Sequence, residues 1–88
     1  MSSKYEPLTA LLRAAASRGQ SAVDLDFDVI ASAVGGLPPS ADLRQWWANS
    51  SHSQALAWRA AGFHVDHVSL DRKRVRFARR ARWQLPRP

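Results

Sequence analysis

The chain has 88 residues, which is the size of a single domain. It contains no cysteine, so disulfides, thiol redox chemistry and thiolate zinc sites are excluded, and a reducing cytoplasm fits. The net charge is +6. Because no apolar run approaches the length of a bilayer span, we expect neither a signal peptide nor a membrane segment.

The first half of the chain predicts a helix, a short strand and a second helix. Residues 7–18 repeat apolar side chains at helical spacing, with a proline in the first turn. Residues 21–27 alternate apolar and acidic side chains, which is typical of a strand with one wet face. Asp26 is expected to cap the second helix, which should end at Gly35.

The middle of the chain predicts a helix that is broken. Two prolines end the preceding helix, and Ser40 is a suitable N-cap for a new helix over residues 41–48. Residues 49–52 are rich in cap-forming side chains, so we expect the break there. The helix should then resume and end at Gly62.

The C-terminal part predicts a β-hairpin followed by a tail. In the second strand Val75 and Phe77 should point inward, with arginines between them pointing outward. The first strand changes phase along its length, so we expect a bulge near Asp66–His67. Residues 81–88 show no period and are expected to form a basic, flexible tail behind one domain over residues 1–80.

The predicted order is a helix, a short strand, a helix, a broken helix and a C-terminal β-hairpin. This α+β order resembles the winged helix-turn-helix fold. In that fold the short strand pairs with the hairpin, the third helix reads the major groove, and the hairpin forms the wing.

At sequence level, "WWANSSHSQALAW" and "AGFHV" carry a W-W-x-N pattern, then A-W, then A-G-[FWY]. They resemble a family of small bacterial domains of unassigned function over residues 5–79. The resemblance implies no activity, but it draws attention to the motif residues Trp46, Trp47, Asn49, His52, Gln54 and Trp58.

Small polar residues fill the interval between Trp47 and Trp58. Asparagine and glutamine can bond adenine bidentately, and serine can bond either a base or a phosphate. The interval falls where a recognition helix would begin, with free N–H groups at its start. We therefore predict base contacts from Asn49, Ser51, His52, Ser53 and Gln54, with helix capping as the alternative role.

The tryptophans divide into two roles. Trp58 is expected in the core. Neighbouring side chains on a helix point about 100° apart, so one of Trp46 and Trp47 should pack inside with Leu43 while the other lines the binding face. We include Trp46 among the candidate DNA contacts and leave open which ring is exposed.

Basic side chains gather in the second half, where residues 42–88 carry ten basic and three acidic groups. Eleven of the thirteen basic residues are arginine, which contacts phosphate through a planar fork. This bias predicts nucleic acid as the partner, with a solubilising surface as the alternative. The residues expected to clamp the backbone or the minor groove are Arg72, Lys73, Arg74, Arg76, Arg79 and Arg80. Arg44 and Arg59 add two charges on the helical face, where Arg59 is expected to contribute to specificity.

Catalysis has little support. His64 and His67 would face opposite sides of a regular strand, and no metalloprotease, P-loop or nucleophile-elbow motif is present. We expect no enzymatic activity, no cofactor and no metal.

The sequence therefore predicts a cytoplasmic, nucleoid-located protein that binds double-stranded DNA as a transcriptional regulator or nucleoid-associated factor. Neutralising about 5 phosphates would give a log–log salt slope near −4.5. Homodimer formation stays open. The alternatives are a protein-interaction module, adaptor or antitoxin-like, that uses the Trp46 and Trp47 face, or a binder of single-stranded nucleic acid.

Overall fold

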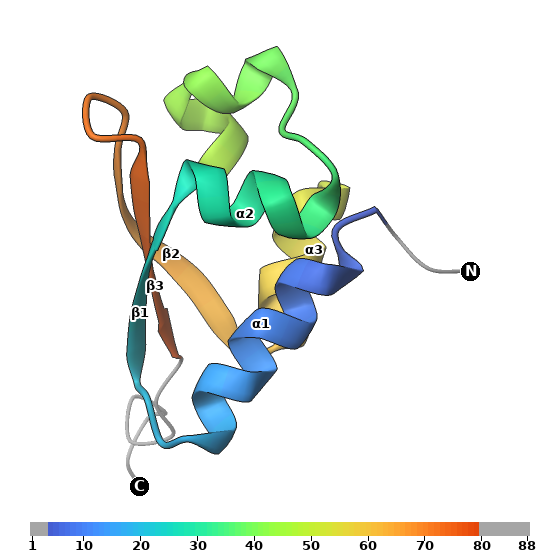
Figure 1. Ribbon diagram of the computed structural model, residues 1–88, viewed down its shortest axis with the longest axis vertical. Helices are drawn as coiled ribbons and strands as arrows, with labels where there is room; N and C mark the ends of the chain where they lie inside the picture. Colours follow the sequence, from blue (N-terminus) through green and yellow to red (C-terminus); the bar gives the residue numbers. More distant parts are fainter. Residues whose placement is uncertain (1–3, 80–88) are drawn as a thin grey trace, which may run out of the picture.

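The computed structural model describes residues 4–79, which form three α-helices, two 3₁₀ turns and one antiparallel sheet (Figure 1). In chain order the elements are α1 (Glu6–Ser17), β1 (Ala22–Asp26), α2 (Phe27–Val34), η1 (Pro39–Asp42), η2 (Arg44–Trp47), α3 (Ser53–Ala60), β2 (Phe63–Ser69) and β3 (Arg74–Arg79). The α+β prediction and the C-terminal hairpin are confirmed.

The sheet has the order β1-β3-β2, so the short early strand pairs with the second strand of the hairpin. All three α-helices lie on one face of the sheet, and none of the described helices covers the other face (Figure 1). Val75 and Phe77 point to the helices and are buried, as predicted. The register shifts between Val65 and His67, which confirms the expected bulge.

Aromatic rings form the centre of the core. Trp47 stacks between Phe27, at 4.9 Å between ring centroids, and Trp58, at 6.0 Å. Trp58 in turn contacts Phe77 of β3. The indole N–H of Trp47 donates to the Ala41 carbonyl at 2.8 Å, so this buried donor is satisfied. Trp58 is a core residue, as predicted, and Trp47 is the inward-facing member of the tryptophan pair.

The prediction of a helix in the first half of the broken helix, before residue 49, is wrong. Two 3₁₀ turns replace it, separated by Leu43 in an extended conformation. In a continuous helix Leu43 and Trp47 would share a face, four residues apart. The extended residue separates them, so Trp47 enters the core while Leu43 is 51% exposed instead of packed.

The junction between β1 and α2 also differs from the prediction. Asp26 occupies the N-cap position but makes no side-chain capping bond. Its carboxylate instead accepts a hydrogen bond from Nε of Arg74, its partner across the sheet, at 2.8 Å. The strand register places an arginine beside this carboxylate, so its bond joins two opposite charges rather than a carboxylate and a neutral N–H.

The end of α2 follows the prediction. Gly35 adopts a left-handed conformation with φ of 79°, which glycine reaches without steric cost. In the part of the chain described, no helix combines the length and the apolar character needed to cross a bilayer.

Candidate nucleic-acid interface

The basic side chains fall into two groups according to the acceptor that each one contacts. Lys73, Arg74 and Arg76 face the carboxylates of Asp42, Asp26 and Asp24, at 2.9, 2.8 and 4.0 Å. Arg13, Arg44 and Arg59 donate instead to the backbone carbonyls of Ala60, Val68 and Ser50, at 3.4, 2.9 and 3.0 Å. A carbonyl carries no net charge, so no carboxylate partner offsets the positive charge of the second group.

The carboxylate-paired arginines lie on the uncovered face of the sheet. The register sets Asp24 opposite Arg76 and Asp26 opposite Arg74. The hydrogen bond to Asp26, reinforced by the charge of that carboxylate, raises the pKa of Arg74 above its ordinary value. Because the acidic column of β1 balances the basic column of β3, this face offers little net attraction to phosphate.

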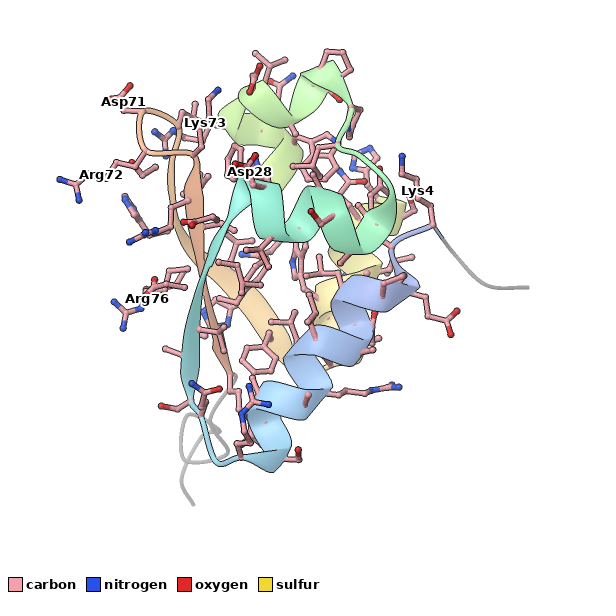
Figure 2. The ribbon with its side chains drawn as sticks, in the orientation of Figure 1. Lys4, Asp28, Asp71, Arg72, Lys73 and Arg76 are labelled. Carbon is pink, nitrogen blue, oxygen red and sulfur yellow. The ribbon has the colours of Figure 1, made fainter. Side chains whose placement is uncertain are left out.

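The basic run predicted after residue 71 is therefore not one surface. Figure 2 shows Arg72 and Arg76 projecting away from the helices, whereas the register places Arg79 opposite Phe63, on the helix-covered side. Arg80 and the predicted tail over residues 81–88 lie outside the described residues.

Arg13 and Arg59 lie on either side of α3. Three of its residues, Ser53, Leu56 and Ala60, are exposed at helical spacing and are called the α3 ridge below. Leu56 is 50% exposed. One hollow of about 620 Å³ lies beside the ridge and is lined by Asn49, Leu56, Arg59, Ala60, Gly62, Phe63 and His64. A second, of about 360 Å³, is lined by Glu6, Thr9, Arg13, Ser53, Leu56, Ala57 and Ala60.

Arg13 is a site residue that the sequence prediction missed. The hydroxyl of Thr9, which is buried, donates to the Ala57 carbonyl at 2.8 Å and ties α1 to α3. Arg13 follows one helical turn after Thr9, so it reaches the Ala60 carbonyl at the end of α3. The sequence signal for this link between α1 and α3 is a threonine on the otherwise apolar, core-facing side of α1.

Asn49 does not present its amide to a ligand as predicted. Its Nδ2 donates to the Val65 carbonyl at 3.1 Å, and its Oδ1 accepts from the Val65 N–H at 2.8 Å. The same Oδ1 accepts from the indole N–H of Trp58 at 3.0 Å. The side chain thus bonds the edge of β2 as a neighbouring strand would, next to the bulge.

Gln54, unlike the exposed Asn49, is buried. It is 8% exposed, and its Nε2 donates to the Trp46 carbonyl at 3.1 Å. The base-reading role predicted for this amide does not fit that burial, because a groove cannot reach it.

The other members of the polar run stay exposed. Ser51 and His52 precede α3, and Ser53 opens it. His52 holds the N-cap position without a side-chain capping bond, and its ring lies 2.9 Å from the Ser50 hydroxyl. The start of α3 therefore retains N–H groups that can meet an anion.

Trp46 is half-buried at the edge of the core, edge-on to Tyr5 at 5.9 Å. With the exposed Leu43 it borders a hollow of about 300 Å³, which Ser40, Gln45, His52 and Gln54 also line. Among residues 4–79, no three histidine, aspartate or glutamate side chains converge as a metal site.

Comparison with protein families matches residues 5–81 to a family described as a domain of unknown function, DUF7662. Neither the curated proteins nor the solved structures gave a match.

Proposed function

We propose that this chain, which belongs to the DUF7662 family of domains of unknown function, is a DNA-binding domain that places α3 in the major groove of a duplex. We further propose that it acts in the cytoplasm, at the nucleoid, as a regulator or a nucleoid-associated factor. Three features of the fold and its surface support this proposal.

The first feature is topology. An early strand inserted beside a C-terminal hairpin, in the order β1-β3-β2, is compatible with a winged-helix arrangement, with β2 and β3 as the wing. The connection from α2 to α3 departs from the usual three- or four-residue turn, because η1 and η2 lie within it. Recognition is therefore assigned to α3 and the wing, without a tight helix-turn-helix pair.

The second feature, and the one that carries the proposal, is the uncompensated charge beside the α3 ridge. Arg13 lines one flanking hollow and Arg59 lines the other, and both bond only carbonyls among the described residues. Glu6 is the one acidic side chain among the described residues that line these hollows. A ridge with arginines on both sides suits a groove bounded by two phosphate backbones.

The third feature is the extent of the surface. The major groove is about 12 Å wide and admits one helix. Beyond the ridge, Arg44 lies against the edge of β2 and Arg72 projects from the wing tip (Figure 2). The uncapped start of α3 adds N–H groups for a phosphate.

A titration of the full chain against a short labelled duplex, followed by fluorescence anisotropy, tests the proposal. If Arg13, Arg44, Arg59 and Arg72 each neutralise one phosphate, the log–log salt slope should be about −3.6 between about 50 and 200 mM salt. A slope near zero, or no binding at the lowest salt, would contradict the proposal.

A second candidate function is protein docking at Trp46. The observation that favours it is the exposed Leu43 next to a half-buried tryptophan, since exposed apolar groups beside tryptophan are typical of binding hot spots. Binding at this hollow should depend weakly on salt and be lost in Trp46→Ala.

Single-stranded nucleic acid stacked on the same ring would be displaced by unlabelled single strands but not by duplex.

A further inference from the structure

We infer that the α3 ridge, if it enters the major groove as proposed above, reads thymine methyl groups through Leu56. The inference rests on the proposed function and adds a sequence class to it. The preferred sites would carry thymines where Leu56 meets the floor of the groove.

The composition of the ridge is the first step. Leu56 is 50% exposed, and its ridge neighbours one turn away on either side are the short side chains of Ser53 and Ala60. Leu56 therefore has the longest side chain of the three ridge residues. It also lines both hollows, so it stands on the crest between Arg13 and Arg59.

The second step is that the fold occupies the side-chain amides near α3. Asn49 and Gln54 are the two side chains near α3 that could bond adenine bidentately, and both are held by the fold. Apart from Arg59, whose guanidinium donates to the Ser50 carbonyl, what the helix offers to base edges is a leucine, an alanine and a serine hydroxyl. Specificity from α3 must therefore come largely from apolar contact.

The chemistry of the groove is the third step. In the major groove the C5-methyl of thymine is the apolar group presented by the natural base pairs, and an apolar side chain long enough to reach it makes contact. Covering one methyl group from water corresponds to about a fourfold gain in affinity. Arg13 and Arg59 contribute affinity through phosphates without distinguishing sequences. The deep, narrow major groove of duplex RNA would not admit the ridge.

Uracil-substituted DNA isolates the methyl group, because deoxyuridine keeps every hydrogen-bonding group of thymidine and lacks only that methyl. The probes are the alternating duplexes poly(dA-dT) and poly(dA-dU), titrated with the full chain at one salt concentration. The unmodified protein should bind the thymine duplex at least about fourfold more tightly. Leu56→Ala should bind the two duplexes equally, and its circular dichroism should match that of the unmodified chain.

Leu43→Ala is the matched control, since Leu43 is as exposed as Leu56 but lies off the ridge. It should keep the full preference for the thymine duplex. Equal affinity of the unmodified protein for both duplexes would overturn the inference and leave DNA binding intact. A preference that survives in Leu56→Ala would also overturn it, whereas failure to bind either duplex would overturn the proposed function as well.

Discussion

Replacing Asn49 by alanine should lower the free energy of unfolding by about 2 to 4 kcal/mol, a large share of the stability of a domain this small. The substitution leaves the indole N–H of the buried Trp58 without an acceptor and frees two backbone groups on the edge of β2. An unsatisfied buried donor retains its full desolvation cost. Urea unfolding monitored by tryptophan fluorescence measures the change.

Two further variants separate the bonds of Asn49. Asn49→Asp keeps an oxygen for the Trp58 and Val65 N–H groups and loses the donor to the Val65 carbonyl, so it should be less destabilising than Asn49→Ala. In a double-mutant cycle with Trp58→Phe, the decrease in unfolding free energy caused by Asn49→Ala should be smaller, because the indole N–H donor has been removed. Unchanged stability in Asn49→Ala, with altered base preference, would instead support the base-reading role predicted from sequence.

Replacing both Arg13 and Arg59 by glutamine should weaken duplex binding by about a hundredfold, with about tenfold from each charge-assisted phosphate contact. Their carbonyl bonds are solvent-exposed, so stability should change little. Anisotropy titrations of the two single variants and the double variant measure the effect. If the affinity of the double variant stays within about twofold of the unmodified protein, the ridge does not contact the DNA.

Local patterns account for the parts of the fold that could be predicted. Helical spacing of apolar residues indicates α1, and alternation indicates β1 and β3. A change of phase within β2 indicates the bulge. The 3₁₀ turns depend on packing: Trp47 reaches Phe27 and Trp58 only because the chain is extended at Leu43. Tertiary contacts of this kind override a helical propensity.

The candidate site was harder to predict, because the partner of each side chain is distant in sequence. Asn49 bonds Val65, and Arg76 faces Asp24 across a strand register that only the folded sheet creates. A polar run whose amides are tied to the backbone looks in sequence like one that is free. The charge bias of the second half is visible in the sequence, but which of its arginines face a carboxylate is decided by the aspartates of β1, in the first half.

The fold pairs some basic residues with carboxylates and leaves others for a ligand, and the salt dependence of duplex binding tests this division most directly. Arg59→Gln and Arg76→Gln remove the same charge from exposed positions on the ridge side and on the carboxylate-paired sheet face. Arg59→Gln should make the log–log slope shallower by about 0.9, and Arg76→Gln should leave it unchanged. A shallower slope for Arg76→Gln with no change for Arg59→Gln would contradict the account and place the DNA on the open face of the sheet.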